Sequence, residues 1–494
     1  MEIAMASKPH LVVIPWPATS HMIPIVDIGC LLAAHGAAVT VITTPGSAQL
    51  VRARVDRAGQ GSSDITVTVL PFPAAEAGLP DGCERLDHVP AAELVPSFFD
   101  ATARFGEAVA RHCRAGAAMA TRRRPTCVIA GMCNTWALGI ARELGAPCFI
   151  FHGFGAFALL CCEYLNTHKP HEAAASVDEL FDVPVLPPFE VRFARRQLPL
   201  QFLPSCSIGE DSLRELREFE VAVDGIVVNS FEELEHGSAA RLAAATGKTV
   251  LAVGPVSLCG GAPGILDSRA DSEDSRRCMA WLDAKKAESV LYVSFGSAGR
   301  MPPAQLMELG AALVSCPWPV LWVIKGADEL PDNVKKWLRE NTDADGVADS
   351  QCLVVRGWAP QVAILEHAAV GGFLTHCGWG STLESVAAGV PMAAWPFTAE
   401  QFLNEKLIVD VLGVGVSVGA TKPTEGVLTG GGGEAKADVG TEQVRKAVEK
   451  LMDGGAEGEG RRRKMQELKA KARAALEHGG SSYVNLEKLI KCAV

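Results

Sequence analysis

The sequence predicts an α/β protein whose parallel sheets are covered by helices. Short runs rich in Val, Ile and Leu alternate with longer stretches rich in Ala, Leu and Glu, which is the rhythm of βα units. Such units place helices on both faces of a parallel sheet. With 494 residues, 48% of them hydrophobic, the chain can bury more than one core. We therefore predict two doubly wound domains.

The first domain should open with a βαβ unit. A buried strand is expected at residues 11–15, because an apolar run ends there at Pro15 and Pro17, and a helix at 23–35 and a strand at 39–44 follow. The ligand crevice of a doubly wound domain lies beyond the carboxyl ends of its strands, so the loop at 18–22 should face it. Further strands are expected at 127–130, 148–151 and 225–229.

A second series of short apolar runs predicts a second sheet of similar construction. Its strands are expected at 250–253, 290–295, 320–324, 352–355, 372–374 and 392–394. Residues 258–275 are rich in Gly, Ser and Asp and are interpreted as the linker between domains. We place the first domain at 1–249 and the second at 250–475. The Pro-rich stretch at 170–204 suits an acceptor pocket.

Charge and hydropathy limit the classes of partner that the protein is expected to bind. A formal charge of -11 argues against nucleic acid or anionic membrane as a partner, because phosphate contacts need a basic surface. The chain shows neither a secretory signal nor a run of about 18 apolar residues, so we expect a cytoplasmic protein without membrane insertion. Its 15 cysteines are scattered without CxxC pairs, and they predict buried thiols rather than disulfides or a metal site.

The segment from Trp358 to Gln401 carries the strongest functional signal. A strand ending at Thr375 runs through a glycine-bearing turn into a helix expected to open at Ser381, and this arrangement favours an anion, since free N–H groups and the helix dipole point at it. Ser381 and Glu384 are spaced as a capping box, although Glu384 could instead accept bonds from a ribose diol. His376 and Trp358 could each be a packed core residue or a ligand contact.

This segment resembles the donor-binding signature of the plant-type family 1 UDP-glycosyltransferases, and it has the same length of 44 residues. The resemblance extends to four other stretches: PHLVVIPWPATSHMIPIVDI, VVNSFEELE, VSFGS and HGGSSYVNLEKLI. It implies a GT-B fold, in which two Rossmann-like domains face each other across a cleft. A C-terminal helix, here 476–494, would cross back to the first domain.

The resemblance also implies roles for individual residues. Trp358 would stack on uracil, and the backbone of Ala359 would bond its edge. Gln361 and Glu384 would hold the ribose. The pyrophosphate would be surrounded by Ser297, His376, Trp379, Gly380 and Ser381. Glu400 and Gln401 would bond the sugar hydroxyls, with Gln401 matching the choice that favours glucose. At Gly380 the family usually has Asn, so one side-chain contact to phosphate is lost.

His21 is the candidate catalytic base. It lies at the start of a helix, where the dipole disfavours imidazolium, and a base should be neutral at working pH. The stretch SHMIP resembles the catalytic GHMIP of the family. The family's Asp partner of this histidine is replaced here by Gly131. We expect either an acidic acceptor hydroxyl that needs no such partner or another group, such as Asn134 or a carboxylate from the acceptor loops, that orients the ring. Restoring the family residue with Gly131→Asp should raise turnover on weakly acidic alcohols unless another group already fills the role.

Together these features predict an inverting transferase that moves a sugar, with glucose favoured, from its UDP conjugate to a small apolar acceptor such as a phenolic, flavonoid or terpenoid hydroxyl. Two alternatives stay open: transfer to an aromatic carbon, and a non-catalytic UDP-sugar-binding protein. UDP-glucose is then a co-substrate. We expect no cofactor, no metal and a monomer.

Overall fold

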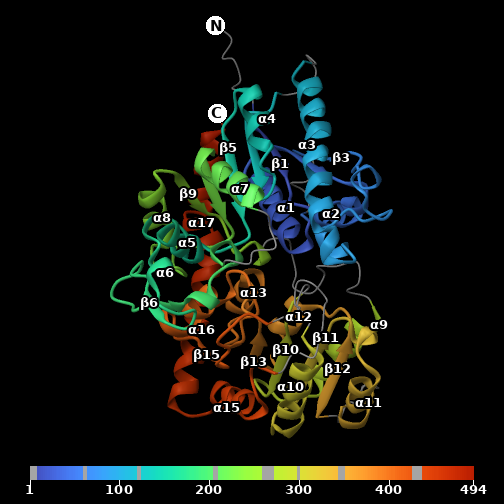
Figure 1. Ribbon diagram of the computed structural model, residues 1–494, viewed down its shortest axis with the longest axis vertical. Helices are drawn as coiled ribbons and strands as arrows, with labels where there is room; N and C mark the ends of the chain where they lie inside the picture. The colour runs from blue at the N-terminus through green and yellow to red at the C-terminus, as the bar shows by residue number, and fades with distance from the viewer. Residues whose placement is uncertain are drawn as a thin grey trace. The chain divides into compact units, whose positions relative to one another are not determined.

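The computed structural model describes residues 8–58, 64–118, 124–203, 210–258, 272–296, 301–342, 351–424 and 437–493. The chain divides into two compact units (Figure 1). The first unit contains residues 1–156, 208–261 and 474–494, and the second contains 157–207 and 262–473. Residues 157–207, which we assigned to the first domain from sequence, therefore group with the second unit.

The sheet of the first unit has seven parallel strands in the order β3-β2-β1-β4-β5-β8-β9. The order reverses between β1 and β4, because β2 and β3 extend to one side and later strands to the other. Val13 of β1 lies between Val41 of β2 and Ile129 of β4, and all three side chains are buried. The strands are β1 (His10–Ile14), β2 (Ala38–Thr43), β3 (Ile65–Val69), β4 (Cys127–Gly131), β5 (Cys148–His152), β8 (Gly225–Val228) and β9 (Thr249–Ala252).

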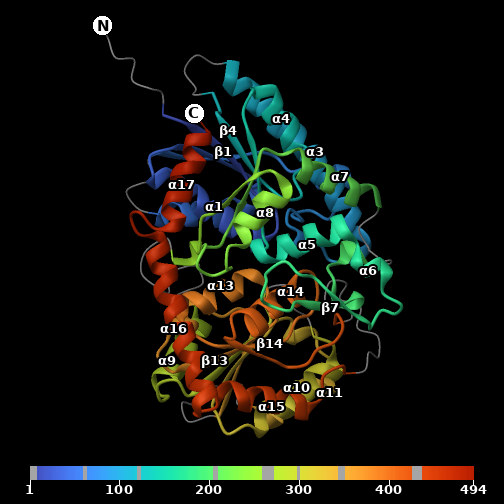
Figure 2. The same ribbon diagram turned by 90° about the vertical axis from the view of Figure 1, so that its left-hand side faces the viewer.

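Helices cover this sheet, and one of them comes from the far end of the chain. Helix α17 joins the core through Leu486 and Leu489 and lies beside α1 (Figure 2). Ser482 Oγ donates to the carbonyl of Gly254 (2.5 Å), and Asn485 Nδ2 donates to that of Ala252 (3.0 Å). The helices are α1 (Thr19–Ala34), α2 (Pro45–Arg57), α3 (Val95–Ala118), α4 (Ala137–Leu144), α7 (Glu210–Ala222), α8 (Ser238–Thr246) and α17 (Ser481–Cys492).

The second unit has a six-stranded parallel sheet in the order β12-β11-β10-β13-β14-β15, which reverses between β10 and β13. Its strands are β10 (Val290–Ser294), β11 (Val320–Ile324), β12 (Cys352–Arg356), β13 (Val370–Thr375), β14 (Met392–Ala394) and β15 (Gly415–Ser417). A separate antiparallel pair consists of β6 (Leu180–Asp182) and β7 (Arg192–Ala194).

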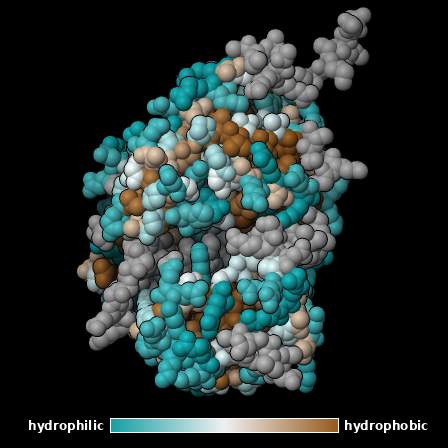
Figure 3. All heavy atoms as spheres, turned by 90° about the vertical axis from the view of Figure 1, so that its right-hand side faces the viewer, coloured by the Kyte–Doolittle hydropathy of each residue, from teal (hydrophilic) through white to brown (hydrophobic). Residues whose placement is uncertain are grey.

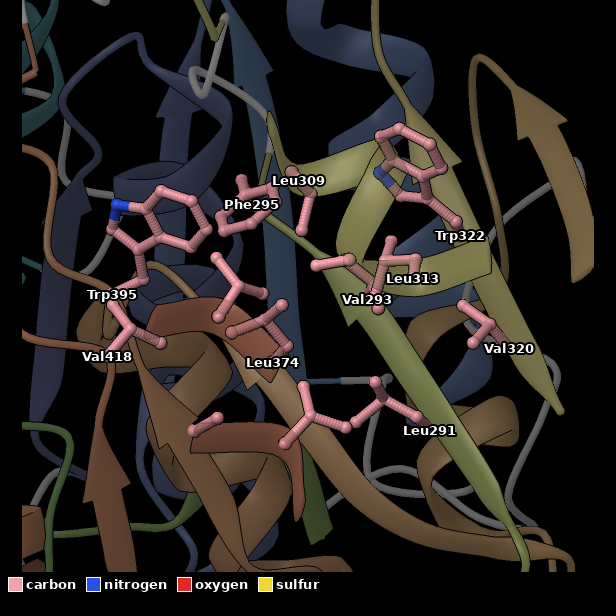
Figure 4. Close-up of a cluster of buried hydrophobic side chains, with 14 of the residues drawn as sticks. Leu291, Val293, Phe295, Leu309, Leu313, Val320, Trp322, Leu374, Trp395 and Val418 are labelled. Carbon is pink, nitrogen blue, oxygen red and sulfur yellow. The ribbon is translucent and has the colours of Figure 1, made fainter. Parts of the chain in front are cut away.

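The core of the second unit lies between this sheet and its helices. Val293 of β10, Leu374 of β13 and Leu313 of α10 point toward one another from three elements (Figure 4). The helices are α5 (Ala156–His168), α6 (Pro170–Ala173), α9 (Glu273–Asp283), α10 (Pro303–Ser315), α11 (Asp332–Asn341), α12 (Gln361–Glu366), α13 (Trp379–Ala388), α14 (Gln401–Lys406), α15 (Thr441–Met452) and α16 (Ala456–Leu476). Two of them, α5 and α16, run across a unit boundary.

The predicted α/β class with two parallel sheets is confirmed. The strand predicted at 250–253 as the first of the second series is β9, which pairs with β8 in the sheet of the first unit, and two predicted boundaries are also wrong. Helix α1 begins at Thr19 rather than 23, because Pro24 fits inside the helix, so the predicted loop at 18–22 is mostly helical. Ser272 caps α9 through its side chain, so the linker cannot extend to 275. Short strands β3 and β15 were missed. Their runs are brief, and β3 is only partly buried.

The surface is mixed, as in most soluble domains. Hydrophilic residues cover most of the face in Figure 3, with hydrophobic groups between them. Among the residues that the structure describes, the exposed large hydrophobic side chains are Val177, Leu180 and Val221. No helix in this described part combines the length and the apolar character that a membrane crossing requires.

Candidate active site

The candidate residues lie where each strand order reverses. In open α/β sheets, ligands bind beyond the carboxyl ends of the strands at this switch point. In the first unit, His21 lies in the first turn of α1 after β1, and Gly131 ends β4. In the second unit, His376 follows β13, and Gly296 follows β10. Each sheet thus brings together residues that are more than 75 positions apart in the chain.

The turn after β13 leads directly into α13. Cys377 takes φ 62°, a left-handed conformation that is unusual for a residue with a side chain, and Gly378 precedes the first helical residue, Trp379. The predicted helix start at Ser381 is therefore wrong by two residues, and Ser381 lies inside the first turn. The free N–H groups at the N-terminus of α13 remain oriented to favour an anion.

His376 is held between two glycines in this turn. A Cβ placed on Gly296 would lie 2.6 Å from its Cε1, and one on Gly378 would lie 2.4 Å from its Nε2. Any larger residue at either position would displace the imidazole. Burial lowers the pKa of His376 to about 4, and its Nδ1 is buried without a hydrogen-bond partner. The ring is thus neutral at pH 7 and keeps one polar atom for a ligand or a water.

Gln361 joins the proposed ribose residues into one network. Its Nε2 donates to Glu384 Oε2 (2.7 Å) and to Ser381 Oγ (3.0 Å). Tyr292 of β10, buried in the sheet, donates its hydroxyl to Gln361 Oε1 (3.2 Å). Sequence analysis missed Tyr292, whose position in an apolar strand gave only a core signal. The capping-box interpretation of Ser381 and Glu384 is wrong, because the N-cap of α13 is Gly378 and Ser381 lies inside the first turn.

The proposed sugar-binding pair lies at the start of α14. Glu400 is buried, and desolvation raises its pKa to about 7, although hydrogen bonds from backbone N–H groups, including that of Trp379, and from Asn404 oppose the shift. Asn404 also donates to the carbonyl of Cys377 (2.9 Å), which braces the turn against α14. Gln401 Oε1 accepts from the N–H groups of Phe397 (2.8 Å) and Thr398 (3.1 Å), so its amide nitrogen is the end left for a sugar.

The remaining donor candidates differ in what the structure shows of them. Trp358 is partly exposed and Ala359 is buried in the loop between β12 and α12. Gly380 is exposed, and a Cβ there would meet nothing within 4 Å. Ser297 lies outside the described residues. Within the described part of the chain, His, Cys, Asp and Glu side chains form no group of three or more suited to a metal ion.

His21 is the candidate base of the first unit. Desolvation, with a smaller contribution from His152, lowers its pKa to about 4, so the imidazole is neutral at pH 7. The start of its helix is anchored by Asp87, which accepts from the N–H (3.0 Å) and the hydroxyl (2.9 Å) of Thr19. His21 Nδ1 is buried without a partner, while the residue as a whole is partly exposed.

Known proteins share this architecture along the whole chain. The family described as UDP-glucoronosyl and UDP-glucosyl transferase matches residues 262–429. UDP-glycosyltransferase 73D1 of Arabidopsis thaliana is 38% identical over 506 aligned residues, which cover 99% of this chain and 97% of that protein. The chain belongs to the plant family 1 UDP-glycosyltransferases. It is therefore a glycosyltransferase of the GT-B class.

Solved structures of family 1 UDP-glycosyltransferases agree with this membership. Glycyrrhiza uralensis UGT73P12, solved with glycyrrhetinic acid 3-O-monoglucuronide, is 33% identical with a TM-score of 0.85, covering 99% of this chain and 96% of that one. A UDP-glucosyltransferase from Polygonum tinctorium capable of glucosylating indoxyl, in complex with 3,4-dichloroaniline, is 27% identical with a TM-score of 0.74 and covers 99% of each chain.

Gly131, the position of the missing family Asp, is closely packed in this family 1 enzyme. A Cβ at Gly131 would lie 2.6 Å from the backbone nitrogen of Trp16 and 2.9 Å from its Cβ. Asn134, the suggested substitute, donates Nδ2 to the carbonyls of Ile14 (3.0 Å) and Pro15 (3.2 Å), and its Oδ1 has no partner. It fixes the end of β1 and does not contact His21 by a hydrogen bond. A side chain at Gly131 therefore requires the backbone at Trp16 to shift, which argues against a simple gain of turnover in Gly131→Asp.

Proposed function

We propose that this enzyme transfers glucose from UDP-glucose to a hydroxyl of a small, mostly apolar acceptor such as a phenolic, flavonoid or terpenoid. The hydrogen-bonded donor residues within 358–401 carry the proposal, because they combine a helix N-terminus for phosphate with a carboxylate and an amide for hydroxyls. Gln401 supports glucose as the sugar. The indoxyl-glucosylating relative supports a small aromatic acceptor.

The mechanism is a single displacement with inversion. His21 Nε2 takes the proton of the acceptor hydroxyl, the acceptor oxygen forms a bond to the anomeric carbon, and the bond from that carbon to the phosphate oxygen breaks. UDP leaves with the electron pair, and His21 returns its proton to solvent. The pKa of about 4 keeps His21 neutral and ready to accept. This weakly basic ring suits an acidic acceptor, whose proton needs little help to leave.

The donor residues have separate tasks in this proposal. Trp358 stacks on uracil beside the backbone of Ala359, and Gln361 with Glu384 binds the ribose hydroxyls. The N-terminal turn of α13, with Trp379, Gly380 and Ser381, stabilises the charge that develops on the leaving pyrophosphate, together with His376 and Ser297. Glu400 and Gln401 bind the sugar. In this scheme the helix N-terminus does the work for which other enzymes use a metal ion.

We further propose that the enzyme is a cytoplasmic monomer of secondary metabolism. The net charge of -11 argues against partners such as anionic membrane or nucleic acid and is compatible with small-molecule substrates. The non-catalytic alternative is not favoured, because proteins 38% identical over nearly the full length are named UDP-glycosyltransferases. Transfer to carbon is not favoured either, and it remains an outcome that product analysis detects.

The test is UDP release from UDP-glucose with a panel of phenols, flavonoids, terpenoid alcohols and simple aliphatic alcohols, followed by mass analysis. Acceptor-dependent release with one added hexose, strongest for the most acidic hydroxyls, is the expected result. Acid treatment then separates products, since an O-glycoside hydrolyses and a C-glycoside does not. UDP binding without release across the whole panel would overturn the proposal.

A further inference from the structure

The Nδ1 edge of His21 faces a glycine at the end of β5. A Cβ on Gly153 would lie 2.5 Å from both Nδ1 and Cε1 of His21, but 3.5 Å from Nε2. The ring therefore turns its Nδ1 edge toward this backbone and its Nε2 away from it. For Nε2 to act as a base it must carry the lone pair, so Nδ1 must carry the hydrogen. A buried N–H needs an acceptor, because leaving it unpaired costs about 1–3 kcal/mol.

The residue before Gly153 is a second buried histidine. His152 is 2% exposed, and its Nδ1 is buried without a hydrogen-bond partner, like that of His21. On its other side, His152 Nε2 lies 3.7 Å from Oε1 of Glu220 on α7. Desolvation lowers the pKa of His152 to about 4, so this ring is also neutral at pH 7. All these groups belong to the first unit.

A carboxylate beside a neutral imidazole selects its tautomer. Glu220 favours the form of His152 with the hydrogen on Nε2, which leaves a lone pair on Nδ1. That lone pair can accept from Nδ1–H of His21, directly after a small ring rotation or through one water. The tautomer of His152 thus determines the tautomer of His21, in which Nδ1 carries the hydrogen and Nε2 carries the lone pair.

We propose that His152 and Glu220 form a positioning pair that orients His21 and replaces the carboxylate missing at Gly131. The inference rests on the proposed function, in which His21 is the base. Neither residue touches substrate in this scheme. When His21 takes the acceptor proton, the charge of the new imidazolium is balanced across His152 by the Glu220 carboxylate, which lies 3.7 Å from His152 Nε2, and no second proton has to move.

Other groups near this pair do not replace it. Arg217, one turn earlier on α7, donates to Glu220 Oε2 (3.3 Å), whereas the oxygen that lies 3.7 Å from His152 Nε2 is Oε1. Cys133 lies near Glu220, and burial raises the pKa of its thiol to about 12, so it stays neutral. Asn134 contacts β1 through Nδ2, and its Oδ1 has no hydrogen-bond partner. The geometry assigns the acceptor role to His152, because Gly153, the residue that follows it, lies against the Nδ1 edge of His21.

The experiment uses the full chain with Glu220→Gln and a matched control, Glu215→Gln. Both residues lie on α7, but the carboxylate of Glu215 accepts from the hydroxyl of Thr135 and is exposed. We expect Glu220→Gln to lower kcat about 10-fold with little change in KM, which is less than the loss of about 10²–10⁴-fold for removing the base itself. Glu215→Gln should match wild type.

The pH profile separates positioning from a merely structural role. The acid limb of kcat/KM reports the pKa of His21 in the free enzyme. Removing a nearby negative charge disfavours imidazolium, so Glu220→Gln should move this limb to lower pH while the plateau falls. Two results in Glu220→Gln would overturn the positioning role. One is a lower plateau of kcat/KM with the acid limb at its wild-type pH, and the other is a plateau equal to that of wild type.

Two variants of His152 complete the test. The amide oxygen of His152→Asn occupies nearly the place of Nδ1, so this variant keeps an acceptor for His21 and loses the link to Glu220. We expect it to be more active than His152→Ala, and Glu220→Gln should then have no further effect in the His152→Asn background. Additive losses would overturn the pair. Full activity in His21→Ala would instead overturn the proposed base, which separates the two failures.

Discussion

Two glycines that replace polar residues of the family differ in their surroundings. Gly380, in the second unit, is exposed, and a side chain there would extend into open space. Gly131, in the first unit, is buried, and its missing Cβ would lie 2.6 Å from backbone of the chain following β1. The first glycine removes a side chain and leaves its place free. The second lies against the backbone of Trp16, so a side chain does not fit there without a shift.

The two candidate sites also differ in how their residues are held in place. In the second unit, Gln361 contacts Glu384 and Ser381 directly, and these residues lie within 24 positions of one another. In the first unit, His21 has no carboxylate within hydrogen-bond distance among the described residues, and its nearest ionisable neighbour of known effect, His152, is far away in sequence. Local hydrogen bonds organise the donor residues, whereas packing between distant segments positions the base.

The largest effect is expected at His21. His21→Ala should lower kcat by about 10²–10⁴-fold, because no other base of the first unit replaces it in the proposed mechanism. UDP affinity should stay near the wild-type value, since the donor residues lie in the second unit. Steady-state rates and calorimetric titration with UDP measure both. An equal loss of kcat and of UDP affinity would show that the His21 site and the donor site are not independent.

Gly131→Asp should destabilise the protein by about 1–3 kcal/mol, the usual range for overpacking a core. The new Cβ would force Trp16 away, and Trp16 packs on Phe98 and Phe99 with ring centroids 5.7 Å and 5.3 Å apart. Urea unfolding measures the change. Gly380→Asn is the matched control and should unfold near the wild-type midpoint. A Gly131→Asp protein with wild-type stability and higher turnover would refute the close packing described for this position.

Glu384→Gln tests the local network of the second unit. Losing the carboxylate removes a charged hydrogen bond, worth about 1.5–3 kcal/mol, both to Gln361 and to the proposed ribose. UDP affinity should fall about 10-fold or more, with kcat on the best acceptor less affected at saturating donor. Titration with UDP and with uridine checks this. Unchanged affinity for both would remove Glu384 from the donor site.

Acid should weaken both units through their buried histidines. His21, His152 and His376 each have a pKa lowered to about 4, compared with 6.5 in an unfolded chain. The unfolded state therefore binds more protons between these values, and stability should fall as pH decreases from about 6.5 to about 4. Urea midpoints at several pH values measure the slope. His376→Asn should flatten it, and an identical slope in that variant would contradict the lowered pKa.

The smallest effect is expected at Gly380. Gly380→Asn places an amide in open space at the N-terminal turn of α13, where it can reach a phosphate, and a net hydrogen bond contributes about 0.5–1.5 kcal/mol. UDP should then bind about 2- to 10-fold more tightly. Gly380→Ala, which adds a methyl group only, is the control. Equal affinity in both variants would mean that the backbone already supplies what the Asn side chain provides in relatives.

How much could be predicted from sequence differs between the sites. Most strands, the presence of two sheets and the segment at 358–401 were predicted, because apolar runs and a glycine turn are local signals, but the strand at 250–253 was assigned to the wrong sheet. The start of α13 was placed two residues late, at Ser381, since Trp379 carries no helix-start signal. Tyr292 and Asn404 were missed, although Asn404 lies one turn after Glu400, a spacing that could have suggested contact.

The sequence by itself determined the family and the α/β class and proposed the residues of the donor site, because each depends on short patterns within one segment. Only the tertiary structure decided what surrounds His21. Its neighbours come from β5, and the atoms that exclude a side chain at Gly131 belong to Trp16, more than 100 residues away in the chain. Contacts of this kind arise when β1, β4 and β5 pair in one sheet, and strand pairing is not encoded in any single segment.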